Sequence, residues 1–238
     1  MIVYGRNPVG EAIRGPRTVI GVWATRNAAR EPWIAEQGPV IVSTEEVGRR
    51  AGSETHQGVC AEVSPFHYSP VEDLLGAEAP LIVALDQVQD PQNLGAICRS
   101  AECAGATGVV ILERRAAQVT PAVCKASSGA VEHLPIARVR NLSDFIHEAR
   151  IPGLWCYGAD RSGTVSYHAV DYTGGVVLVL GSEGRGLRPR VAAACDAVVA
   201  IPLRGRIGSL SVSAAAAVLL YGAADARGRR SVGDLPHP

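Results

Sequence analysis

The most constraining feature of the chain is a series of short, almost uninterrupted apolar runs from residue 81 onward. Segments with helical patterning separate these runs, which are Leu81–Leu85, Val109–Leu112, Leu154–Tyr157, Val176–Leu180 and Ala197–Ile201. Strands that are apolar along their whole length are buried on both faces, and helices between them allow successive strands to run parallel. The pattern therefore predicts an α/β domain in which helices cover both faces of a parallel sheet.

The first 67 residues predict a separate small α/β unit. Asn7 and Pro8 resemble the N-cap and the first position of a helix, and a second helix is expected from Ser43. Three short strands are expected at residues 18–24, 40–42 and 58–63. Proline and glycine then interrupt the pattern, so we expect residues 68–80 to form a linker with a short helix and residues 81–238 to form the larger domain.

The composition excludes several classes of protein. Hydrophobic residues make up 47% and charged residues 19%, which is typical of a globular chain. No stretch reaches the ~20 apolar residues of a membrane span, and the N-terminus lacks the layout of a signal peptide, so we expect a cytoplasmic location and no membrane partner. The six cysteines lack the spacing of zinc ligands. We expect buried, reduced thiols and no metal site.

The formal net charge is zero, but the basic residues are unevenly distributed. Residues 185–206 contain five arginines and a single acidic residue, Asp196. Phosphate contacts dominate the affinity of nucleic-acid binders, so this local excess matters more than the sum. The preference for arginine over lysine, with Lys125 as the only lysine, decides nothing, because a GC-rich genome would give the same bias.

Polar segments follow three of the apolar runs, at the points where the expected strands end. They are Asn93–Arg99, Gly181–Gly186 and Ile201–Ser213. Because ligands of parallel sheets bind outside the carboxyl ends of the strands, we expect these segments to contribute to one site.

Each segment also has a purely structural interpretation. Asn93 could cap a helix, Arg99 could be a solvated helical arginine, and Glu183 could be a carboxylate at a helix N-terminus. The glycines of the second segment could be mistaken for a dinucleotide-binding loop. Such a loop would follow the first strand and would precede an acidic residue by about 20 positions. Neither condition holds, so a nucleotide-dependent oxidoreductase is disfavoured.

In this order, the segments resemble the three signature motifs of the SpoU/TrmH-type RNA ribose 2′-O-methyltransferases of the SPOUT superfamily. The resemblance implies a catalytic domain with a trefoil knot, preceded here by a small α/β RNA-binding domain. It also implies S-adenosylmethionine as the cofactor and a homodimer that completes the active site. The methyl group would pass to a ribose 2′-oxygen, and only RNA carries that hydroxyl, so RNA and not DNA is the expected substrate.

The resemblance assigns roles by motif position. Gly181, Ile201 and Leu210 would contact the cofactor, and the catalytic group would comprise Asn93, Arg99, Glu183, Ser209 and Ser211. We expect Arg99 to hold a phosphate, because a guanidinium pKa above about 12 makes arginine a poor base. In the homodimer, Arg99 could serve the site of the neighbouring subunit.

Two further stretches extend the resemblance. Tyr4–Val9 and His56–Val59 resemble the small RNA-binding domain of bacterial 23S rRNA (guanosine-2′-O-)-methyltransferases, which makes a guanosine in 23S rRNA the favoured substrate. Lys125–Pro135 resembles another segment of the family. Within it, His133 has the wrong neighbours for a metal ligand, and we expect a packed or capping histidine.

One position departs from the family pattern. The usual string Ser-Leu-Asn-Val-Ser has its asparagine replaced here by Ser211. A serine hydroxyl offers fewer hydrogen bonds and a shorter reach than an asparagine amide. We expect activity to be retained, because the other motif positions are intact. The alternatives are a catalytically weakened or inactive RNA-binding or ribosome-assembly protein, and a methyltransferase that acts on tRNA.

Overall fold

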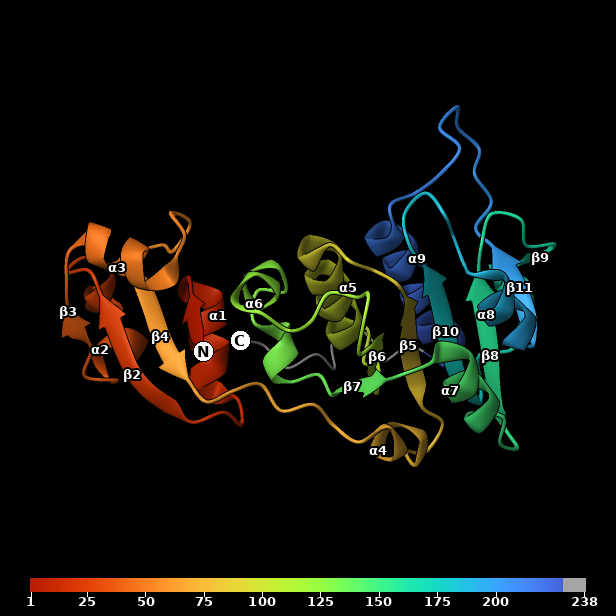
Figure 1. The fold of residues 1–238 in the computed structure, drawn as a ribbon, viewed down its shortest axis with the longest axis horizontal. Coiled ribbons are helices and arrows are strands. Elements are labelled where there is room, and N and C mark those ends of the chain that lie inside the picture. Colours follow the sequence, from red (N-terminus) through yellow and green to blue (C-terminus); the bar gives the residue numbers. More distant parts are fainter. Residues whose placement is uncertain (229–238) are drawn as a thin grey trace.

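The computed structural model describes residues 1–228, which form two sheets and their surrounding helices (Figure 1). The N-terminal unit contains β1 (Ile2–Tyr4), α1 (Arg6–Arg14), β2 (Val19–Ala24), α2 (Pro32–Ala35), β3 (Val40–Ile41), α3 (Thr44–Ala51) and β4 (Val59–Val63). α4 (Val71–Leu75) follows, and the larger unit then begins with β5 (Leu81–Asp86), α5 (Pro91–Cys103), β6 (Gly108–Leu112), α6 (Pro121–Ala126), η2 (Ala130–Glu132), β7 (Ile136–Val139) and α7 (Leu142–Glu148). It continues with β8 (Leu154–Ala159), β9 (Val165–Ser166), β10 (Gly175–Gly181), α8 (Pro189–Ala194), β11 (Ala197–Ala200) and α9 (Val212–Ala226).

The larger sheet has the strand order β7-β6-β5-β10-β8-β11-β9, and every neighbouring pair is parallel. This confirms the α/β class, and all five strands expected from the apolar runs are present. The apolar pattern does not predict the two edge strands. β9 has only two residues, and the exposed Arg138 interrupts the apolar run of β7.

Each face of the larger sheet has its own core. In β5, Leu81, Val83 and Leu85 pack on the side of α5 and α9, whereas Ile82 and Ala84 pack on the side of α4, α7 and α8. Successive side chains of a strand point to opposite faces, so a sheet covered twice has no polar positions along its central strands. The uninterrupted apolar runs of the sequence follow from this arrangement.

The small unit has the sheet order β1-β4-β2-β3, with β1 as a strand that the sequence did not predict. The predicted N-cap at Asn7 is wrong, because α1 begins at Arg6 after Gly5, whose φ of 92° turns the chain directly out of β1. The predicted start of α3 is confirmed, since the Ser43 hydroxyl accepts a hydrogen bond from the Glu46 backbone N–H. α4 is the short helix expected between the units.

The trefoil knot and the exact domain boundaries stay predictions, and residues 229–238 of the predicted larger domain lie outside the described residues. Within residues 1–228, no helix is both long and apolar enough to span a membrane.

Most of the cysteines follow the expectation of buried thiols. Cys60, Cys98, Cys124 and Cys156 are buried, and burial raises the pKa of Cys98 to about 12. The expectation is wrong for Cys103, which is exposed at the C-terminal end of α5.

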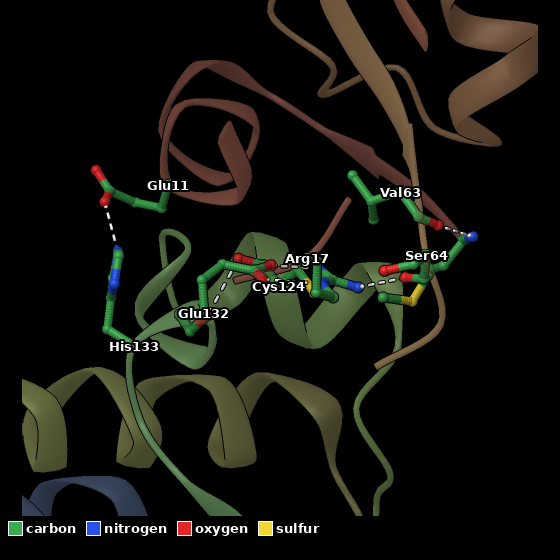
Figure 2. A network of polar contacts seen from close by, with 9 residues as sticks. Glu11, Arg17, Val63, Ser64, Cys124, Glu132 and His133 are labelled. Carbon is green, nitrogen blue, oxygen red and sulfur yellow. Dashed lines mark hydrogen bonds and ion pairs between the residues drawn. The ribbon is translucent and has the colours of Figure 1, made fainter. Parts of the chain in front are cut away.

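A buried ion pair joins the small unit to the larger one. Arg17, which follows α1, donates from Nε to Glu132 Oε2 at 2.8 Å and from Nη2 to Glu132 Oε1 (Figure 2). The two side chains are only 5% and 1% exposed. At the rim of the same contact, His133 Nε2 lies 2.8 Å from Glu11 Oε2 with more than a third of its side chain exposed. The expectation of a capping His133 is confirmed, because its backbone N–H donates to the Ala130 carbonyl at the C-terminal end of η2. Its side chain is not packed in the core and instead forms a partly exposed contact between the units.

We predict that loss of the buried Arg17–Glu132 pair lowers the stability much more than loss of an exposed ion pair does. Glu132→Ala should lower the free energy of unfolding by about 3–5 kcal/mol, because it leaves the Arg17 guanidinium buried without a counter-charge. Glu31→Ala, which breaks the exposed pair with Arg6, should cost no more than about 1 kcal/mol. Equilibrium unfolding in urea measures both changes. Equal losses for the two variants would contradict the importance assigned to the buried pair.

Candidate functional site

A cleft of about 630 Å³ opens at the carboxyl ends of β8, β10 and β11. Loops after these three neighbouring strands and the start of α9 form its walls. Six of the eight residues assigned from the motifs line it, namely Gly181, Glu183, Ile201, Ser209, Leu210 and Ser211. The second and third sequence segments therefore meet at one edge of the sheet, as the strand pattern predicts.

The second segment forms a tight loop that only glycine allows at its base. Gly181 and Gly186 lie so close that a Cβ on Gly181 would overlap the backbone of Gly186 and Leu187. The Gly186 N–H donates to the Ser182 carbonyl at 3.0 Å, and Gly184 and Gly186 both have positive φ. Glu183 is exposed in this loop, and α8 begins only at Pro189. The alternative role of Glu183 as a carboxylate at a helix N-terminus is therefore wrong.

The third segment ends in a capped helix. Ser211 is the N-cap of α9, and its Oγ accepts a hydrogen bond from the Ala214 N–H at 3.2 Å. The same oxygen lies 3.2 Å from Ser213 Oγ. Serine and asparagine are about equally good N-caps, so the departure from the family string preserves this structural role.

A chain of hydrogen bonds connects Ser211 to Asn93. Ser213 Oγ donates to Asn93 Oδ1 at 3.0 Å, and Asn93 Nδ2 donates to Asp90 Oδ2 at 3.2 Å. Asp90 is the N-cap of α5, so the interpretation of Asn93 as a cap is wrong. The single proton of Ser213 goes to Asn93, and Ser211 must therefore donate to Ser213. One lone pair of Ser211 Oγ stays available to accept a bond from the cleft.

Arg99 lies apart from the cleft. It follows Asn93 by six residues, which places it about 240° further around α5 and about 9 Å along the helix axis. Asn93 faces α9, whereas the exposed Arg99 donates from Nη1 to Ser128 Oγ at 3.1 Å beside α6. One helix therefore presents the two residues in different directions.

The sequence interpretation missed two carboxylates that shape the cleft. Asp160 follows β8 and accepts hydrogen bonds from the Ser162 N–H and Oγ. Burial disfavours its charge, but these bonds and one from the Leu187 N–H outweigh burial and keep the pKa of Asp160 below its usual range. Asp86 ends β5 and accepts from Arg188 Nε at 2.7 Å, which fastens the glycine loop to the neighbouring strand.

Ser213 is a third missed residue. The sequence did carry a signal for the two carboxylates. Asp86 and Asp160 stand at the carboxyl ends of apolar strands, which is the edge where ligands of parallel sheets bind. Among residues 1–228, no group of three or more histidine, cysteine or acidic side chains is arranged to hold a metal ion.

Two family models match the chain. The model described as RNA 2′-O ribose methyltransferase substrate binding matches residues 2–69, and the model of the SpoU rRNA Methylase family matches residues 80–221. The chain belongs to the SpoU rRNA methylase family. The two matches correspond to the small unit and to the parallel-sheet unit that carries the cleft.

Known relatives are similar over nearly the whole chain. A Bacillus subtilis protein named as a TrmH family tRNA/rRNA methyltransferase is 36% identical over 92% of this chain and 93% of its own length. The SpoU methyltransferase AviRb from Streptomyces viridochromogenes, solved with AdoMet, has a TM-score of 0.82 and 25% identity, covering 95% of this chain and 90% of its own. An AdoMet-bound rRNA methyltransferase from Sinorhizobium meliloti has a TM-score of 0.75 and 29% identity, covering 93% and 85%.

The capping role of Ser211 predicts how substitutions change the stability of this SpoU-family protein. Ser211→Ala should lower the free energy of unfolding by about 1 kcal/mol, whereas Ser211→Asn should change it by less than about 0.5 kcal/mol. Ser43→Ala, which removes the equivalent cap of α3, is the matched control and should cost about as much as Ser211→Ala. Thermal unfolding measures all three. A Ser211→Asn variant less stable than Ser211→Ala would contradict the capping role.

Proposed function

We propose that this protein transfers a methyl group from S-adenosylmethionine to a ribose 2′-hydroxyl of RNA, with a guanosine in 23S rRNA as the favoured substrate. The observation that carries the proposal is the cleft, in which two motif segments of a SpoU-family chain meet at one sheet edge. The match of residues 2–69 to a substrate-binding model supports RNA as the substrate. The rRNA methyltransferase among the similar structures supports rRNA.

The cleft fits S-adenosylmethionine in size and chemistry. Its volume lies within the range of about 300–1,000 Å³ that is usual for sites of small ligands. Ile201, Leu203 and Leu210 offer apolar contact to a flat base, and the backbone near Gly181 and Gly208 is free of side chains that would block a ligand. When bound there, the cofactor supplies an activated methyl group on a sulfonium.

The chain's own residues would orient the ribose. Ser211 Oγ has one lone pair free toward the cleft, which can accept a hydrogen bond from a 2′-hydroxyl and turn its oxygen toward the methyl donor. Ser213, Asn93 and Asp90 hold Ser211 in the orientation that leaves this lone pair free. Ser209 and Glu183 border the same space and would contact the substrate or the loops around it.

We also propose that the active protein is a homodimer. Arg99 points away from the cleft of its own subunit, toward α6, and it is exposed. A guanidinium in that position can hold an RNA phosphate at the site of a second copy by a charge-assisted fork. The predicted phosphate contact of Arg99 is therefore compatible with its position only if two subunits share the substrate.

Two alternatives keep the fold and change the function. The serine at position 211 is the observation that favours an RNA-binding protein with weakened or lost catalysis. The similarity to a relative named for both tRNA and rRNA leaves tRNA as the alternative substrate. Both alternatives are outcomes of the transfer experiment below.

Gly181→Ala tests the cofactor site. The added Cβ would force the backbone of Gly186 and Leu187 to move, so affinity for S-adenosylmethionine should fall at least about tenfold, as for a loss of 1.4 kcal/mol or more. Gly10→Ala is the control, because its Cβ would meet only ordinary contacts in α1 and the change should not alter the affinity. Isothermal titration calorimetry measures both. Unchanged binding by Gly181→Ala would contradict the assigned site.

The reaction itself is tested with cofactor that carries a labelled methyl group. Purified 23S rRNA and bulk tRNA from cells lacking the protein are the substrates. The proposal expects label in the rRNA at one nucleotide whose 3′-linkage resists alkali, because alkaline cleavage requires a free 2′-hydroxyl. Label in tRNA alone would establish the tRNA alternative. Label in a base, with normal alkaline cleavage, would overturn the ribose assignment.

A further inference from the structure

The seam between the two units holds the only lysine of the chain. Lys125 is near the end of α6, and its Nζ donates to Gln57 Oε1 of the small unit at 3.0 Å. Gln57 Oε1 also accepts the Arg6 N–H at 3.0 Å. A Cβ on Gly5 would overlap the Lys125 ammonium, so the glycine leaves the space into which this lysine reaches.

The Lys125 ammonium has no counter-charge in the described part of the chain. Its protein partner is a neutral amide, although an ammonium carries three donors. Three arginines of the small unit do have a counter-charge. Arg6, Arg14 and Arg17 each form an ion pair with a glutamate. Lys125 is partly buried, and burial lowers its pKa. A partly buried cation without a counter-charge can bind an anion from outside the protein.

A second unpaired cation lies against the same turn. Arg99 donates to Ser128 Oγ at 3.1 Å, and the Ser128 N–H donates to the Lys125 carbonyl at 3.1 Å. Within residues 1–228, neither Arg99 nor Lys125 forms an ion pair. Figure 1 shows α6 between the small unit and α5. The turn at Ser128, directly after α6, therefore bonds both to Arg99 of α5 and to the backbone of Lys125.

We propose that Lys125 binds a backbone phosphate of the RNA at the seam, next to the position of Arg99. The inference rests on the proposed function, since it gives the RNA substrate a second contact outside the cleft. Two ammonium donors that the protein leaves free can bind phosphate oxygens, while Gln57 holds the third toward the small unit. The small unit and the catalytic unit then bind the RNA as one surface.

The test is the affinity of the full chain for a fluorescein-labelled RNA hairpin of 30 nucleotides between 50 and 200 mM KCl. Lys125→Gln should lower the affinity about tenfold at the lowest salt and flatten the slope of log affinity against log salt by about 0.7–0.9, the value for one lost phosphate contact. Lys125→Arg should keep the slope.

Two matched variants separate phosphate binding from other roles. Gln57→Ala removes the hydrogen bond between the units and keeps the charge, and it should leave the slope unchanged. Arg49→Gln removes a cation that pairs with Glu46, and it should change the slope by less than Lys125→Gln does. If Gln57→Ala flattens the slope as much as Lys125→Gln does, Lys125 only links the two units. If Arg49→Gln flattens it as much, the effect is one of net charge. Either result overturns the proposal.

The outcome is distinguishable from failure of the proposed function. Methyl transfer by the native chain together with an unchanged slope for Lys125→Gln would overturn the seam site alone. A slope that depends on Lys125 in a chain that never methylates RNA would support the seam site and overturn the enzymatic proposal. A native chain that does not bind the hairpin would overturn the seam site whatever its transfer activity.

Discussion

The site depends on the insertion of β10 between β5 and β8. The parallel registers on its two sides set Gly181 opposite Asp86 and Leu180 opposite Ala159, so three strand ends meet at one edge. The chain after Gly181 can turn sharply only because no Cβ occupies that position, and the ion pair of Asp86 with Arg188 fastens the end of the turn. Without this hydrogen-bonded register, the loops that form the cleft would not face one another.

The hydrogen bonds from Asp90 through Asn93 and Ser213 to Ser211 give the serine a definite orientation. A free hydroxyl rotates, but this one has its proton committed to Ser213 and one lone pair committed to the start of α9. The remaining lone pair is unused within the protein, and Ser211 lines the cleft. Replacement of asparagine by serine therefore preserves both the helix cap and an acceptor, and it shortens the reach of that acceptor. This is the physical basis for expecting a working enzyme.

Much of the fold could be predicted because strands buried on both faces are apolar along nearly their whole length, as in β5, β6 and β10. β1 and β9 escaped prediction because each has only two or three residues, and unlike the equally short β3 neither directly follows a turn signal such as Gly38-Pro39. The motif spacing located the cleft-lining segments, but spacing along α5 could not reveal that Arg99 and Asn93 face different ways. The Arg17–Glu132 contact joins residues 115 positions apart, and no local pattern marks either one as buried. Long-range packing of this kind is set by the tertiary structure alone.

The most direct measurement is the single-turnover rate of methyl transfer to 23S rRNA by the native chain and by Ser211→Asn, at saturating S-adenosylmethionine. If Ser211 caps α9 and accepts the ribose hydroxyl, the native chain transfers the methyl group at a rate within about a hundredfold of the asparagine variant, the scale of a 1 Å misplacement. A native chain that transfers nothing, beside an asparagine variant that gains activity, would contradict this account. It would mark the protein as an RNA binder that has lost its catalysis.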